Sequence, residues 1–138
     1  MTNEQITQIK NSWKLLRNVD ADLIGDVFYS KLFLHNPNLR ILFPGSMNDQ
    51  YKKLVMMLSF IIARIDRPQE MVEEVRSLAV RHVRYGVKPE HYSIVGEALL
   101  WTLEKGLGKD WNKELKDAWL ACYNLLSATM IAATQQPA

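Results

Sequence analysis

One histidine, His82, carries the clearest chemical signal of this sequence, inside residues 81–92, RHVRYGVKPEHY. Val72, Val75 and Ala79 precede it at spacings of three and four, which predicts that all four side chains share one face of a helix. A buried, neutral imidazole is a common ligand for iron. One histidine cannot hold a bare metal ion, which needs about three or four protein ligands, but it can hold haem iron, because the porphyrin supplies the in-plane ligands.

His82 has a simpler alternative, because a lone histidine on an apolar face is more often a hydrogen-bonded core residue than a ligand. The other histidines, His35 and His91, have no comparable context and are expected at the surface or at a helix start. The one cysteine, Cys122, excludes an internal disulfide, suits a reducing cytosol and is expected as a small buried helix residue. The choice for His82 therefore depends on the rest of the chain.

The composition is that of a soluble globular protein. The chain has 138 residues, 48% of them apolar and 23% charged, with a formal charge of +2. This length suits one domain with a real core, and so small a charge does not by itself indicate nucleic-acid binding. The polar N-terminus has no signal-peptide core, and the longest apolar run, residues 54–63, is shorter than the roughly 20 residues that cross a membrane. We expect a soluble, cytoplasmic protein whose tail, residues 135–138, frays.

Every periodic segment predicts a helix, and none predicts a strand. Thr2 and Gln5 form a capping-box pattern that opens the first helix, while Gly86 ends the helix that carries His82 and Pro89 opens the next one. The predicted helices cover about residues 2–16, 20–32, 36–43, 47–65, 68–85, 89–107 and 111–130. About seven helices of unequal length, joined by short connections, favour an all-α, globin-like packing over an even four-helix bundle.

Four stretches of the chain resemble a bacterial single-domain globin, close to the globin module of flavohaemoglobins. They are residues 26–33 (DVFYSKLF), 36–43 (NPNLRILF), 81–92 (RHVRYGVKPEHY) and 91–100 (HYSIVGEALL). The resemblance covers nearly the whole chain, and the order and spacing of the stretches make it specific. It implies a single globin domain over residues 1–138 that encloses a pocket for haem b, iron protoporphyrin IX.

The same resemblance implies the residues of the site. His82 would be the proximal iron ligand, and Phe43 would wedge against the haem. Further contacts to the cofactor are implied for Tyr92, Lys53, Arg81, Val87 and Val95. The distal side, where a gas would bind, is implied to contain Tyr29, Gln50, Leu54 and Phe28.

The residue types on the implied distal side suit oxygen chemistry. Gln50 and Leu54 are one helical turn apart and share a face, while Tyr29 comes from another helix. Oxygen bound to ferrous haem becomes partly negative, so a phenol and an amide can donate charge-assisted hydrogen bonds to it. Leu54 would keep the pocket dry. Without the resemblance, Tyr29 is more often a core tyrosine and Gln50 a solvated side chain.

Basic residues surround both sides of the implied pocket. Arg81, Arg84 and Lys88 flank His82, and Lys52 and Lys53 follow Gln50. Lysine and arginine bind carboxylates well, so some of these side chains are expected to meet the haem propionates. The alternative for each of them is a solvated helix face.

Two departures from the flavohaemoglobin pattern bear on activity. In that family a tyrosine at the position of Tyr92 joins a glutamate beside the proximal histidine, but here the glutamate position, eleven residues after Tyr123, is Thr134. A threonine supplies no carboxylate, so a weaker electron push and inefficient dioxygenase turnover are expected. The 138 residues also lack a Gly-rich dinucleotide fingerprint, so any nitric oxide dioxygenase-type activity is expected to need a separate reductase.

The expected function is therefore a haem protein that binds oxygen, nitric oxide or carbon monoxide, for oxygen binding or transfer or for nitric oxide scavenging, as a monomer or weak dimer. The alternative is a gas or redox sensor acting through a separate partner protein. A haem-free interaction module is disfavoured by His82 together with Tyr29 and Gln50. Nucleic-acid binding through the basic residues near His82 is the weakest alternative, because that helix must bury one face.

Overall fold

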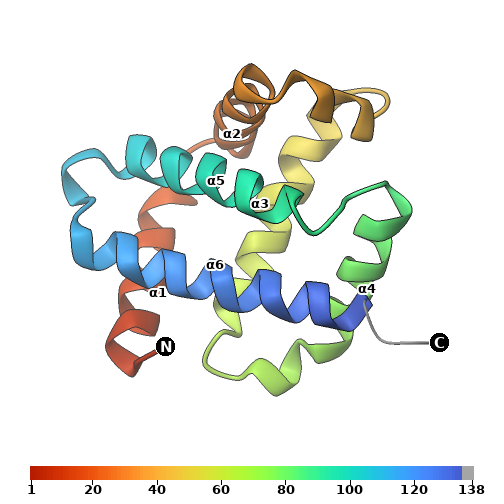
Figure 1. Cartoon of the computed structure of the whole chain (residues 1–138). Helices are drawn as coiled ribbons and strands as arrows, with labels where there is room; N and C mark the ends of the chain where they lie inside the picture. The colour runs from red at the N-terminus through yellow and green to blue at the C-terminus, as the bar shows by residue number, and fades with distance from the viewer. Residues whose placement is uncertain (135–138) are drawn as a thin grey trace.

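In a computed structural model, the chain is described over residues 1–134, and nearly all of that part is helical (Figure 1). The α-helices are α1 (Asn3–Leu16), α2 (Ala21–His35), α3 (Met47–Ala63), α4 (Val72–Arg84), α5 (His91–Leu107) and α6 (Lys113–Thr134). Short 3-10 helices are η1 (Pro37–Leu42), η2 (Pro68–Glu70) and η3 (Gly108–Asp110). The prediction of an all-α chain is confirmed, and the tail predicted to fray, residues 135–138, lies outside the described residues.

The first helix boundary was predicted correctly. The Thr2 hydroxyl accepts a hydrogen bond from the Gln5 amide at 3.1 Å, and the Gln5 side chain accepts one from the Thr2 amide at 3.0 Å. This reciprocal capping box satisfies two backbone donors that a helix start leaves free.

Three later helices were predicted to be longer than they are. The helix expected from Pro68 begins at Val72, because a 3-10 turn ends at Met71 with φ −124° and ψ 7°, outside the α-helical region. The helix expected from Pro89 begins at His91, after a turn over residues 88–91. The helix expected to reach residue 65 ends at Ala63.

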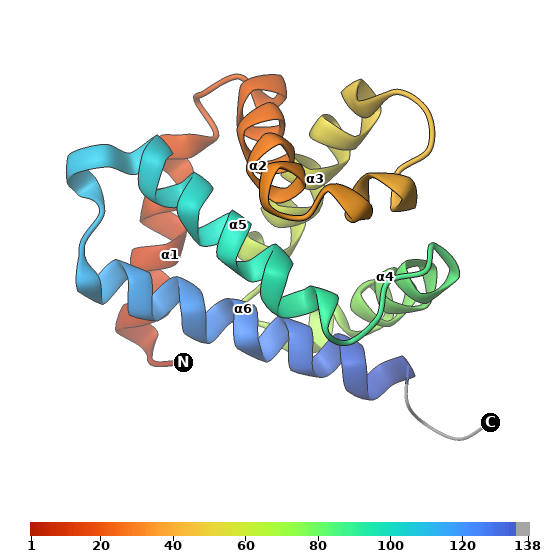
Figure 2. The same cartoon turned by 45° about the horizontal axis from the view of Figure 1, so that its top comes forward.

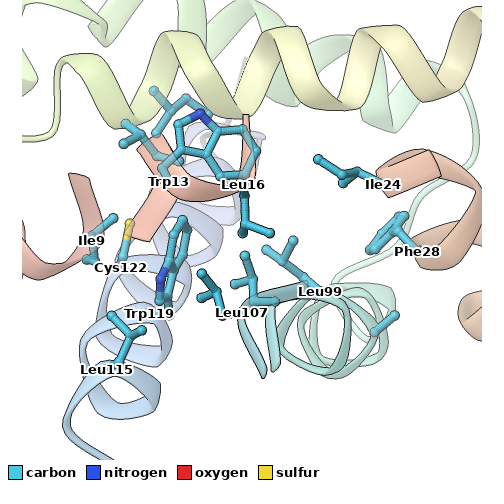
Figure 3. Packing of buried hydrophobic residues seen from close by; sticks show 14 of the residues in the cluster. Ile9, Trp13, Leu16, Ile24, Phe28, Leu99, Leu107, Leu115, Trp119 and Cys122 are labelled. Carbon is cyan, nitrogen blue, oxygen red and sulfur yellow. The ribbon is translucent and has the colours of Figure 1, made fainter. Parts of the chain in front are cut away.

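The main hydrophobic core lies between α1, α2, α3, α5 and α6 (Figures 1 and 3). Trp13 of α1 and Trp119 of α6 pack with their ring centroids 6.2 Å apart. Their indole N–H groups donate to Ser59 and Ser12, each at 3.0 Å, so both rings are buried without losing a hydrogen bond. Cys122 is buried in this cluster, as predicted.

Helix α4 stands apart from that core. It lies beside the C-terminal half of α6 (Figure 2), and its buried residues Val75 and Ala79 form a second small cluster with Met130 of α6. Val72, the first residue of α4, is 48% exposed although the helix period places it only about 20° around the helix from buried Ala79. It shares their face, but it lies at the end of the helix where the second cluster no longer covers it.

Within residues 1–134, none of the helices is both long and apolar enough to span a membrane.

Candidate functional site

His82 lies near the end of α4 with a half-buried side chain. Its Nδ1 atom is 2.8 Å from the carbonyl oxygen of Leu78, one turn earlier. Because a carbonyl only accepts, Nδ1 must carry the proton, and Nε2 of the neutral ring keeps its lone pair. Burial lowers the pKa of His82, the charge of Arg81 acts in the same direction, and the bond to Leu78 opposes both. The ring is therefore held neutral, with one ring nitrogen free to bind a metal.

The turn after His82 brings this end of α4 toward η1. Gly86 has φ +95°, a backbone conformation that favours glycine, and the Val87 amide donates to the His82 carbonyl at 3.0 Å. A Cβ atom at Gly86 would be 3.2 Å from a methyl group of Leu42. The glycine thus allows the turn to approach η1, the segment that Phe43 follows, and leaves Val87 half-buried.

Tyr29 of α2 lies in a cluster of aromatic rings. Its side chain is only 7% exposed, and its ring centroid lies 4.8 Å from Phe28, 5.2 Å from Phe43, 5.8 Å from Phe33 and 5.9 Å from Tyr51. Burial, with a smaller contribution from Tyr51, raises the pKa of Tyr29 to about 12. Its hydroxyl is therefore a proton donor at neutral pH, and no residue between 1 and 134 accepts a hydrogen bond from it.

Gln50 and Leu54 lie one turn apart on α3, and both are half-buried. The Gln50 amide makes no hydrogen bond to another side chain or backbone group in the described part of the chain. Leu54 packs against the main core. The structure thus brings Tyr29 and Phe43 into contact, and it leaves both Gln50 and Tyr29 with polar groups that no described residue engages.

Phe28 and Leu54 also line an apolar cavity of about 190 Å³ between α1, α2, α3 and α5. Figure 3 shows part of its wall, where Ile24 and Phe28 face Leu16 and Leu99. No side chain of α4 lines this cavity. Phe28 contacts the Tyr29 ring and also lines the cavity.

The first turn of α5 is anchored to α6 near His82. The Tyr123 hydroxyl donates to the carbonyl of Tyr92 at 2.5 Å, and a Cβ atom at Gly96 would be 2.6 Å from the Tyr123 ring. Thr134 donates to the backbone carbonyl of Ile131 at 3.0 Å and supplies no carboxylate. The Tyr92 hydroxyl has no hydrogen-bond partner within residues 1–134. Sequence reasoning missed the Tyr123 anchor, for which Gly96 within an apolar helix was the available signal.

The remaining predicted residues lie around this region. Val95 of α5 is half-buried, Lys53 is exposed, and Arg81 donates to the Ser77 hydroxyl at 2.9 Å. In the described residues, Lys53, Arg81, Arg84 and Lys88 form no ion pair. They are available to a carboxylate ligand, although the exposed ones equally fit the solvated-face alternative.

The other histidines take the places expected of them. His35 is exposed beside Lys31, and Nδ1 of His91 accepts the Lys88 amide at 2.9 Å at the start of α5. Among residues 1–134, no group of three or more histidine, cysteine, aspartate or glutamate side chains is placed to hold a bare metal ion. This leaves His82 to act as a ligand only where the other ligands come from a cofactor.

Comparisons with known proteins find one matching family model and several similar chains. The model of the family described as "Globin" matches residues 26–130. An uncharacterized globin-like protein of Aquifex aeolicus is 34% identical over 131 residues, which cover 95% of this chain and 92% of that one. A flavohemoprotein of Vibrio cholerae is 31% identical over 134 residues, 95% of this chain but only 34% of the flavohemoprotein. The structure of a bacterial globin from Campylobacter jejuni has a TM-score of 0.84 at 28% identity and covers 96% of this chain and 95% of that one.

Proposed function

Because this chain belongs to the globin family, we propose that it binds haem b through His82 and reversibly holds oxygen, nitric oxide or carbon monoxide. The observation that supports this most directly is the 2.8 Å bond from His82 Nδ1 to the Leu78 carbonyl. Fixing the other ring nitrogen in this way is how proteins orient a metal-binding imidazole and set its tautomer. The lone pair on Nε2 is the donor that a five-coordinate haem iron needs from the protein.

The surrounding side chains fit a flat, apolar cofactor with two carboxylates. Phe43 would pack against one face, and Val87, Val95 and Tyr92 would line its edge, since all four are half-buried. Arg81 and Lys53, which form no ion pair within residues 1–134, would meet the propionates. When bound, haem iron supplies the position at which a diatomic gas is held.

The distal residues would control what that position holds. Tyr29 is buried, protonated and without a hydrogen-bond partner in the described residues, so its hydroxyl is free to donate to a partly negative ligand. Gln50 would be a second, more mobile donor. Leu54 and Phe43 would exclude water, which strengthens hydrogen bonds within the pocket.

Oxygen binding or transfer, or nitric oxide scavenging, is the proposed role. The flavohemoprotein relative supports a link to redox chemistry, and this chain spans about a third of that relative's length. We propose a reductase as the partner that would supply electrons for multiple turnovers. The Thr134 hydroxyl bonds to backbone carbonyls and offers no charge near His82, which favours gas binding over strongly activating chemistry.

The visible absorption spectrum of the purified protein, oxidised and reduced, tests the proposal. His82→Ala should abolish stoichiometric haem uptake, with rescue only by added imidazole, because the variant lacks the imidazole proposed to bind the iron. His35→Ala is the matched control and should keep the parent spectrum, since His35 is exposed. A normal spectrum in His82→Ala, together with its loss in His91→Ala, would contradict the assignment.

A further inference from the structure

We propose that Tyr51 of α3 is a positioning residue that holds the Tyr29 ring in the orientation from which its hydroxyl reaches the bound gas. The backbone of Tyr51 lies directly against Gly25, and its hydroxyl donates a hydrogen bond to Asp26. Its ring lies beside the ring of Tyr29. The inference rests on the proposed function, because it takes Tyr29 as the donor to that gas. It concerns a residue that follows Gln50 directly and that the sequence did not single out.

The backbone end of Tyr51 lies directly against α2. A Cβ atom added at Gly25 would be 2.4 Å from Cβ of Tyr51 and 2.6 Å from its Cα. Real Cβ atoms do not approach so closely, so α2 and α3 can cross at this distance only because residue 25 is glycine. Glycine inside a helix is less favourable than alanine. The close crossing is what the chain gains from it, and it places the Tyr51 side chain beside α2.

The hydroxyl end of Tyr51 is held by the same helix. It donates to Oδ1 of Asp26 at 3.4 Å, and the same oxygen accepts the Ser30 hydroxyl at 3.1 Å. Asp26 is the neighbour of Gly25 in sequence, so α2 contacts both ends of the Tyr51 side chain. The long Tyr51–Asp26 distance indicates a bond of modest strength.

Between these two ends, the Tyr51 ring faces the Tyr29 ring. Their centroids are 5.9 Å apart and their planes are inclined by 31°. Phe28 and Phe33 contact Tyr29 from its own helix, and Phe43 contacts it from the end of η1. Tyr51 alone among these four comes from α3, the helix that also carries Gln50 and Leu54.

This placement matters because hydrogen-bond strength falls steeply with donor distance and angle. A Tyr29 ring that rocks by a few tenths of an ångström more would donate less well to a ligand fixed on the iron. The Tyr51 hydroxyl also adds to the rise in the pKa of Tyr29, which keeps Tyr29 protonated as a donor. Tyr51 would thus act on the gas only through Tyr29.

Oxygen and carbon monoxide release from the haem-loaded protein test this. Tyr51→Phe keeps the ring but loses its bond to Asp26, and it should speed oxygen release by about twofold, the lower end of the range for one ordinary hydrogen bond, with carbon monoxide release unchanged. The single variant Asp26→Asn keeps an oxygen that can accept the bond from the Tyr51 hydroxyl, so its rate of oxygen release should equal that of the parent. Tyr85→Phe, on a tyrosine that is 60% exposed, is the matched control and should change neither rate.

A double variant shows whether Tyr51 acts through Tyr29. In a Tyr29→Phe background, Tyr51→Phe should have no further effect on oxygen release. NMR gives a readout that is independent of gas release. In the carbon-monoxide form, the line shapes of the Tyr29 ring-proton signals should show faster ring flips in Tyr51→Phe than in Asp26→Asn. A Tyr51→Phe effect that persists without the Tyr29 hydroxyl would overturn the positioning role, as would its absence when Tyr29→Phe alone speeds release. No effect of Tyr29→Phe would instead overturn the assignment of Tyr29 in the proposed function.

Discussion

Tyr29 and His82 would face the haem from two regions that are packed in different ways. Tyr29 belongs to the main core, where aromatic rings from α2, α3 and the end of η1 surround it. His82 belongs to α4, whose buried residues Val75 and Ala79 pack on Met130 in a separate, smaller cluster. The proposed distal side is therefore organised by packing of α2 against α3, α5 and η1, whereas the helix of the proposed proximal side packs mainly on α6.

Exposed valines make the difference larger. Val72 and Val83 are 48% and 51% exposed, and valine is a weaker helix former than the residues that usually occupy exposed helix positions. Helix α4 also packs mainly on one other helix, α6. Ligation of His82 and contacts to the haem would add to its stability, so haem binding should order α4 more than α2.

Removal of haem should therefore separate the two regions. We expect backbone amide exchange in α4 to become about 100-fold faster or more, since segments with few buried contacts open at low free-energy cost. Amides of α2 should change by less than about tenfold, because most contacts of this helix are with the main hydrophobic core. Hydrogen exchange of the haem-loaded and haem-free proteins, read by mass spectrometry, measures both. Equal acceleration in α2 and α4 would contradict the comparison.

Tyr29→Phe should produce the next largest effect, on the distal side alone. A hydrogen bond to a charged group contributes about 1.5–3 kcal/mol, so its loss should speed oxygen release by about 10- to 150-fold. Gln50→Leu should act in the same direction but less, because an amide on a flexible stem is harder to hold in place. Stopped-flow release of oxygen from the ferrous protein gives both rates.

Carbon monoxide is the internal control for Tyr29→Phe. It carries little charge when bound, so its release should change much less than that of oxygen in both variants. Equal effects on the two gases would mean that Tyr29 acts by its bulk, and no effect on either would remove it from the pocket.

The sequence predicted the helices well and their limits less well. Apolar periodicity and caps such as Thr2 located every α-helix, because those signals are local. The starts at Val72 and His91 were missed, since a 3-10 turn and an α-helical turn share the same proline signals. Val72 shares the face of Ala79 as predicted, but the spacing could not show that the first residue of the helix would be left exposed.

For the candidate site, the sequence identified residues but not what holds them. The Leu78 carbonyl could have been anticipated, because it lies one turn before His82 on the same helix. The Tyr123–Tyr92 and Tyr51–Asp26 hydrogen bonds join residues 31 and 25 positions apart, and they depend on how closely two helices cross. Glycine in a helix interior, as at residues 25 and 96, is the one trace that such crossings leave in a single sequence.

Tyr123→Phe provides the smallest and most selective test, because it makes on the proximal side the same chemical change that Tyr29→Phe makes on the distal side. The lost hydrogen bond joins the Tyr123 hydroxyl of α6 to the carbonyl of Tyr92 in the first turn of α5. Both groups are uncharged, so the variant loses one ordinary hydrogen bond. The free energy of unfolding should fall by about 0.5–1.5 kcal/mol, measured by urea denaturation of the haem-loaded protein. Oxygen and carbon monoxide release should keep their parent ratio, since Tyr123 holds backbone near His82 and contributes no donor to the gas. A selective rise in oxygen release, like that expected for Tyr29→Phe, would show that the two regions are coupled and that packing on one side sets hydrogen bonding on the other.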